Sequence, residues 1–160
     1  MAGQGTQDPR QNTEIISAAV FRLEVPGMTA INFAELVGIS SEVENAEYMA
    51  SGPTGPVFSR HFGRTKPPTV TLKRGLDLNG DLWLWHQKVR NLMYDAYRDC
   101  ALKLYGPGDD LNGDARLTYM MTNAWPAKVE VSGVKAGSTD IVYQTVTLMC
   151  DDLFDFNARI

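Results

Sequence analysis

Apolar residues at every second position dominate this sequence, and this two-residue period is the feature that most restricts its fold. From Ile15 to Val25 one parity holds the apolar set Ile15, Ala19, Phe21, Leu23 and Val25, and the pattern returns at Ala30 to Ile39 and at Arg98 to Tyr105. Side chains of a strand alternate between two faces, so this period predicts strands with one covered face. The other expected strands lie at Thr69–Arg74, from about Ala115, from Trp125 to Val131 and at Thr139–Cys150.

One segment has a helical period instead. Between Asp81 and Tyr97, apolar residues recur every three or four positions, which is typical of a helix that packs on a sheet. Strands outnumber helices, so we expect a mainly β domain, a sandwich or barrel flanked by this helix. Predicted core residues are Phe21, Phe33, Trp85, Leu92 and Trp125.

The length of 160 residues favours a single domain. Residues 1–13 are polar and predict a flexible arm, and the domain is expected to span residues 14–160.

The net charge of -4 gives no general attraction to nucleic acid or anionic membranes. No stretch approaches the roughly 20 apolar residues of a membrane-spanning helix, and no signal-peptide pattern occurs, so cytoplasmic synthesis without membrane insertion is expected.

Residues 50–68 contain four prolines and three glycines, which predicts a long loop or a protruding hairpin. Charge changes sign around it: four acids and no base lie between Glu35 and Glu47, and five bases and no acid between Tyr48 and Leu76. This order indicates either an ordinary solvated surface or complementary patches that join identical subunits. The candidate contact residues are Glu44, Glu47, Met49, Phe58, Arg60, Phe62, Arg64 and Lys66.

A nucleic-acid surface is the alternative interpretation of the basic segment, because Phe58 and Phe62 interleave its bases as stacking residues would. The acidic charge of the whole chain weighs against it. The same exposed aromatic residues also suit a protein interface.

No constellation for catalysis, metal binding or cofactor binding is evident. The two histidines, His61 and His86, lie in no metal-ligand pattern, and no nucleophile or phosphate-binding motif occurs. The repeated DLNGD at residues 77–81 and 110–114 lacks the glycine and glutamate of a calcium loop, so it predicts tight turns, with Asn79 or Asp81 capping the helix. We therefore expect no enzyme.

The two cysteines, Cys100 and Cys150, fall on the apolar side of their strands. Buried reduced thiols are expected, because a free cysteine behaves as a small core residue. A disulfide or a catalytic thiol is the alternative.

Several segments together resemble the phage tail tube protein family typified by the T4 tail tube. They are VPGMTA, FAELVGISSEVENAEYMASG, TVTLKRG before a helix with LWLW, NAWPAKVEVSG and IVYQTVTLMCDDLF, within residues 15–156. The resemblance implies a small β-barrel of two packed antiparallel sheets with one flanking helix. It matches Met49–Pro68 to an extended hairpin that contacts neighbouring subunits, and Trp83, Trp85 and Trp125 to packing aromatics.

The resemblance also implies a function. Six subunits would close a ring, and rings would stack into the inner tube of a contractile injection particle. Partners would be further copies, a contractile sheath, baseplate or spike and tube cap proteins, with protein cargo or DNA in the lumen. One polar strand face would line this lumen, either the face of Gln144 or that of Tyr143, Thr145 and Thr147. The alternatives are a tube that conducts DNA in a phage virion and, in another class, a monomeric ligand-binding barrel.

Overall fold

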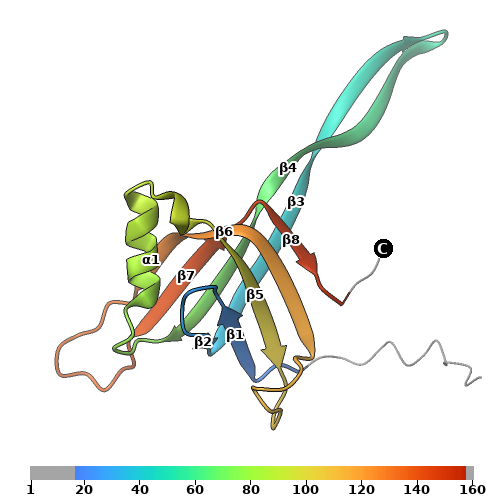
Figure 1. Cartoon of the computed structure of the whole chain (residues 1–160). Helices are drawn as coiled ribbons and strands as arrows, with labels where there is room; N and C mark the ends of the chain where they lie inside the picture. Colours follow the sequence, from blue (N-terminus) through green and yellow to red (C-terminus); the bar gives the residue numbers. More distant parts are fainter. Residues whose placement is uncertain (1–16, 158–160) are drawn as a thin grey trace, which may run out of the picture.

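The structure is a computed structural model that describes residues 17–157. It consists of eight antiparallel strands, one α-helix and one short 3-10 helix (Figure 1). In chain order the elements are β1 (Val20–Glu24), β2 (Ile31–Phe33), β3 (Glu35–Gly52), β4 (Gly55–Gly75), α1 (Asp81–Arg90), η2 (Tyr94–Ala96), β5 (Arg98–Tyr105), β6 (Leu117–Val131), β7 (Tyr143–Met149) and β8 (Asp152–Asp155). The mainly β class with one α-helix is confirmed. The predicted N-terminal arm lies outside the described residues.

All eight strands belong to one sheet, in the order β2-β1-β5-β6-β7-β4-β3, with β8 paired to β6. The two packed sheets that the resemblance implied are therefore two halves of one curled sheet, which is not closed by a ladder between its end strands. Those end strands, β2 and β3, are separated in the chain only by Ala34, whose N–H donates to the carbonyl of Lys73 at 3.0 Å.

Strand β6 connects the two halves of the sheet. Its first part pairs with β5 and β8, and its second part pairs with β7. The change of partners occurs at Asn123, where φ is 51°. The backbone N–H of Asn123 donates to Asp99 at 2.9 Å, and its side-chain amide donates to Asp151 at 2.9 Å. The two strands that the sequence predicts, one from about Ala115 and one from Trp125 to Val131, are thus one strand with a bend.

The core lies between the halves of the sheet and α1. Leu82 and Trp85 of the helix are buried there with Leu72 of β4, Leu102 of β5 and Leu148 of β7. Burial of apolar surface of this kind contributes about 25 cal/mol per Å² to folding.

The predicted core residues differ in how deeply the structure buries them. Phe33 and Trp85 are buried, and Phe21 is half-buried against the core. Trp125 is half-buried. The prediction for Leu92 was wrong, because its side chain is 89% exposed.

The helix ends earlier than expected, and this explains the error at Leu92. Instead of continuing to Tyr97, α1 stops at Arg90, and Leu92 takes a φ of 55°, outside the helical region. The chain then forms η2 and buries Ala96 on its way into β5. Positions after Arg90 therefore no longer follow the helical period.

Candidate assembly surfaces

Strands β3 and β4 form a long hairpin that projects from the rest of the molecule (Figure 1). Within β4, the residues that also pair with β7 are Thr69–Gly75. Beyond them, from the pair Glu42↔Lys66 to the pair Gly52↔Gly55, the hairpin is a ribbon of two strands without a covering layer. Ten residue steps at 3.3 Å make this part about 33 Å long. The protruding-hairpin alternative for residues 50–68 is confirmed. Prolines are compatible with it, because edge ribbons tolerate residues that lack an N–H donor.

The acidic and basic segments of the sequence form ion pairs with each other inside this hairpin. Three cross-strand ion pairs join an acid of β3 to a base of β4: Glu47–Arg60 at 3.5 Å, Glu42–Lys66 at 2.8 Å and Glu35–Lys73 at 3.7 Å. The hydrogen bond from Lys66 to Glu42 raises the pKa of the lysine above its ordinary value. Exposed pairs of this kind contribute little to stability, because water and salt screen them.

Two charged candidate contact residues, Glu44 and Arg64, lie outside these three ion pairs. Within residues 17–157, Glu44 and Arg64 have no oppositely charged group within 4.0 Å. Both side chains are exposed. They are available for contacts outside the chain, and complementary patches between subunits stay a prediction.

One face of the hairpin is rich in exposed apolar residues. The register sets Met49 opposite Phe58, and Phe62 lies on the same face opposite Asn45. The three apolar side chains are 65%, 69% and 97% exposed, respectively. Because soluble proteins seldom expose such side chains together, this face is typical of a surface that another protein covers.

A second apolar surface lies where α1 ends. A groove of about 430 Å³ is lined by Val89, Leu92, Met93, Tyr94, Ala96, Tyr97 and Trp125. The sequence did not predict this groove, because Leu92 and Trp125 were assigned to the core and the helix was expected to continue to Tyr97.

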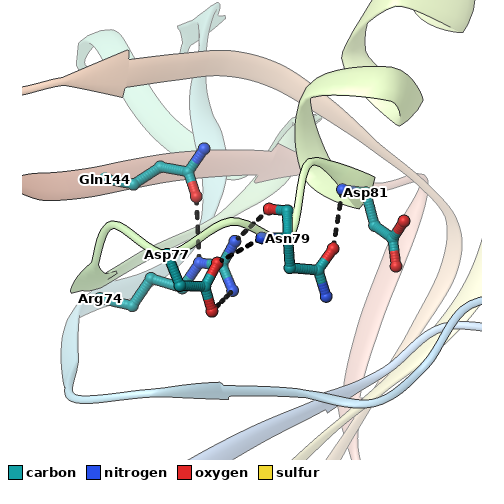
Figure 2. A network of polar contacts seen from close by, with 5 residues as sticks. All are labelled: Arg74, Asp77, Asn79, Asp81 and Gln144. Carbon is teal, nitrogen blue, oxygen red and sulfur yellow. Dashed lines mark hydrogen bonds and ion pairs between the residues drawn. The ribbon is translucent and has the colours of Figure 1, made fainter.

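A buried arginine organises the connection between the sheet and α1 (Figure 2). Arg74, at the end of β4, is 5% exposed. Its guanidinium donates to Gln144 Oε1 at 3.0 Å, to Asp77 Oδ2 at 3.4 Å and to the carbonyl of Asn79 at 3.2 Å. The sequence contained one signal for this site, the TVTLKRG segment before the helix, but Arg74 was not singled out.

The acidic turn continues this network into the helix. Asp77 Oδ1 accepts from the N–H of Asn79 at 3.0 Å, and Asn79 Oδ1 accepts from the N–H of Asp81 at 2.9 Å. The N-cap residue is Gly80, so the prediction of Asn79 or Asp81 as the cap was wrong, although Asn79 satisfies the N–H of the first helical residue from one position earlier. In the second DLNGD copy, Asp110 accepts similarly from Asn112 at 3.0 Å, so both copies are turns.

The histidines and cysteines of residues 17–157 each have local contacts or lie buried in the core. His61 is 3.0 Å from the Ser59 hydroxyl, and His86 Nδ1 is 2.9 Å from the carbonyl of Pro126. Burial raises the pKa of Cys100 to about 12 and that of Cys150 to about 11, so both thiols are protonated at neutral pH. In the described part of the chain, no three His, Cys, Asp or Glu residues cluster as metal ligands would.

Helices long and apolar enough to span a membrane are absent from residues 17–157.

Comparisons with known proteins agree with this architecture. A chain in the sheath/tube terminator of the PVC extracellular contractile injection system is 23% identical, with a TM-score of 0.70 over 89% of this chain and 96% of that chain. A chain in the anti-feeding prophage tube-terminating cap is 20% identical, with a TM-score of 0.71 and coverages of 91% and 93%. A chain in the PVC sheath-tube complex is 19% identical, with a TM-score of 0.66 and coverages of 94% and 98%. These likenesses show the fold.

No curated protein matches the sequence. The model of one protein family, described as "T4-like virus tail tube protein gp19", matches residues 17–153. The match includes the hairpin, the Arg74 network and all of the sheet except the end of β8. The chain therefore belongs to the T4-like virus tail tube protein gp19 family.

Proposed function

We propose that this chain is a structural subunit of which six copies close a ring, and that the rings stack into the hollow inner tube of a phage-like contractile injection system. Family membership supports a tube role, and the exposed β3–β4 hairpin is the observation that carries self-assembly. An isolated two-stranded ribbon is marginally stable, and this one exposes Met49, Phe58 and Phe62. A neighbouring subunit would cover it.

The hairpin and the rest of the subunit are unlike surfaces, and contact between unlike surfaces generates rings or open stacks. The eight candidate contact residues all lie on this hairpin. In the tube, the hairpin would bury its aromatic face, and Glu44 and Arg64 would find partners on adjacent copies.

The partners follow from the assemblies in which similar chains occur. Those structures are described as a sheath-tube complex, a tube-terminating cap and a baseplate. We propose that this chain likewise contacts a sheath, a baseplate and a cap, and that sheath contraction propels the tube to deliver its cargo. The particle would assemble in the cytoplasm, and the subunit would have a structural role without catalysis.

Two alternative functions are a phage tail tube and a ligand-binding barrel. A phage tail tube would share the same ring and conduct DNA, and genes for a capsid beside this one would favour it. A ligand-binding barrel would need an apolar interior cavity. The interior described here is filled by side chains such as Leu23, Leu72 and Leu148, which are 0% exposed.

The test is negative-stain electron microscopy of the purified protein, with and without a co-expressed sheath protein. Rings and hollow stacks are expected, and sedimentation should show concentration-dependent assembly. Single rings that never stack would favour a terminal role at the end of a tube. A monomer at all concentrations, with and without the sheath, would contradict the proposal.

A further inference from the structure

We infer that the groove at the end of α1 binds the aromatic face of the β3–β4 hairpin of a second copy. This inference rests on the proposed function and names the surface that receives the hairpin. The aromatic face carries Met49, Phe58 and Phe62, and the groove is lined in part by Tyr94 and Trp125. Both surfaces are open to solvent in the single chain, since Tyr94 is 93% exposed and Phe62 is 97% exposed.

The two surfaces lie at the same end of the sheet but at opposite edges. Strand register aligns Trp125 of β6, Met149 of β7, Thr69 of β4 and Ser40 of β3 in one row. The three interstrand steps of this row measure about 14 Å in total. Helix α1 packs on β6, whereas the hairpin continues from β3 and projects away from α1 (Figure 1). A hairpin therefore points away from its own groove, and the contact needs a second copy.

The copy that offers the groove is displaced along the hairpin. The strand runs from Thr69 out to Phe62, which places Phe62 about 23 Å beyond the row at 3.3 Å per residue. This distance is greater than the width of the row, so a copy at the same height does not bring its groove to the aromatic face. Contact between unlike surfaces of displaced copies repeats from one subunit to the next, as tube growth requires.

The two surfaces match in shape and chemistry. The groove is concave, with a volume of about 430 Å³, and the hairpin is a projecting ribbon. Each surface combines methionine with aromatic rings: Met93 and Tyr94 in the groove, and Met49 and Phe58 on the hairpin. Thioether–aromatic and aromatic–aromatic contacts are favourable when they are buried. One contact thus covers two exposed apolar surfaces and also supports a ribbon that is marginally stable alone.

Each surface also carries a charge without a counter-ion of its own. Glu44 precedes Asn45, the residue opposite Phe62, and Arg90 ends α1 two positions before Leu92 of the groove. Both charged side chains are exposed, and neither has an oppositely charged group within 4.0 Å in the described part of the chain. Phe62 packed beside Leu92 brings the carboxylate of Glu44 to the guanidinium of Arg90.

The test places one cysteine on each surface, in separate chains. Asn45→Cys lies on the aromatic face and Asn91→Cys lies beside Leu92, and both replace exposed polar residues, so the apolar contact is kept. The two variants, one of them tagged so that heterodimers are recognised by size, are mixed, assembled and treated with a short bismaleimide. In the matched control, Ala136→Cys in the exposed loop between β6 and β7 replaces Asn91→Cys.

Because the contact raises the effective concentration of the two thiols, we expect about tenfold more heterodimer from Asn45→Cys with Asn91→Cys than from the control in intact tubes. The native cysteines are buried, so they add little background. Equal yields, or a heterodimer only with Ala136→Cys, would put the hairpin on another surface and overturn the inference. Cross-linking of Asn91→Cys to a co-expressed sheath protein in place of the hairpin would also overturn it.

A charge exchange tests the same contact without cysteines. Arg90→Glu should slow tube growth about tenfold, because it sets two acids against each other. Glu44→Arg in the same chain should restore growth, since each interface then again joins an acid to a base. A double variant that assembles no faster than the single variants would contradict the contact.

These results are distinguishable from failure of the proposed function. Wild-type protein that forms no tubes contradicts that function, whereas tubes with another cross-linking pattern contradict only the contact. A cryo-electron microscopy map of wild-type tubes tests the contact without any substitution. We expect Phe62 of one copy to lie against Leu92 of another, and Phe62 in solvent or on a different surface would overturn the inference.

Discussion

The Nε–H of Arg74 donates a 3.0 Å hydrogen bond to Oε1 of Gln144, and the two residues lie directly opposite one another on β4 and β7. Both are buried, at 5% and 4% exposure. The rest of the guanidinium holds the turn that leads into α1. A single side chain thus connects β4 and β7 to the start of α1.

Replacing Arg74 by Met should lower the free energy of unfolding by about 2–4 kcal/mol, because it leaves Gln144 and the carbonyl of Asn79 without their donors. Urea unfolding under conditions that keep the protein unassembled measures this loss. Arg64→Met is the matched control, since Arg64 is an exposed arginine without an ion pair, and it should change stability by less than about 0.5 kcal/mol. Equal effects of the two substitutions would refute the structural role of the network.

Replacing Phe58 and Phe62 together by Ser should abolish tubes while leaving the subunit folded. Both side chains are largely exposed, so the isolated subunit loses little burial, but the aromatic face loses the area that a neighbour would cover. Electron microscopy measures assembly, and circular dichroism measures folding. A control that removes an exposed ion pair away from the hairpin, Lys128→Gln with Glu130→Gln, should still form tubes. Normal tubes from the double Ser variant would exclude the hairpin as the main contact.

Charge reversal of the basic strand should impair tube growth. Arg60→Glu with Arg64→Glu places an acid opposite Glu47, so part of its effect would come from repulsion inside the hairpin. Arg64→Glu alone is the cleaner variant, because it breaks no ion pair within residues 17–157. We expect slower assembly that added salt partly restores, measured by light scattering. Unchanged kinetics in low salt would show that Arg64 contacts no acid in the tube.

Replacing Trp85 by Phe should destabilise the fold by about 1–3 kcal/mol. The indole N–H donates to the carbonyl of Ala96 at 2.7 Å, and both the hydrogen bond and ring volume would be lost. Trp83→Phe on the same helix is the control, since Trp83 is 43% exposed, and thermal unfolding compares the two. Trp85→Asp should yield no soluble folded protein. Wild-type-like stability of Trp85→Asp would refute the placement of α1.

The two cysteines should resist thiol reagents in the folded protein. Burial raises the pKa of Cys100 from 9.0 to about 12 and that of Cys150 from 9.0 to about 11. The stabilisation linked to these protonated thiols is fully present below pH 9 and is lost as the pH rises toward the folded-state values. A colorimetric thiol assay at pH 8 should detect little reaction until urea is added. Rapid reaction of the native protein would show that the thiols are accessible.

Most strands could be predicted because their alternation is local. Each of the segments around Phe21, Leu102 and Val146 carries its own two-residue period, which needs no knowledge of partners. The hairpin was harder, because its tip has no covered face and its prolines are typical of loops. Strand β8 escaped prediction, since only four residues pair there, through contact with β6.

The candidate contact residues were chosen from charge order and exposed aromatics, and the hairpin brings all of them onto one ribbon. The acids and bases proposed to meet between subunits first meet each other across β3 and β4. That pairing depends on register, which charge order alone does not specify. The groove at the end of α1 was missed because Leu92 fits the helical period that the backbone abandons at Arg90.

The mainly β class, the presence of one helix, the tight turns and the family follow from the amino-acid order alone, since they depend on local periodicity, turn residues and the order of segments. That Gln144 faces the core with Arg74 while Thr145 faces solvent depends on the folded arrangement. Alternation separates the two faces of a strand, but both faces of β7 carry polar residues. Which face is covered depends on where the sheet curls and where α1 packs, and these are properties of the assembled fold.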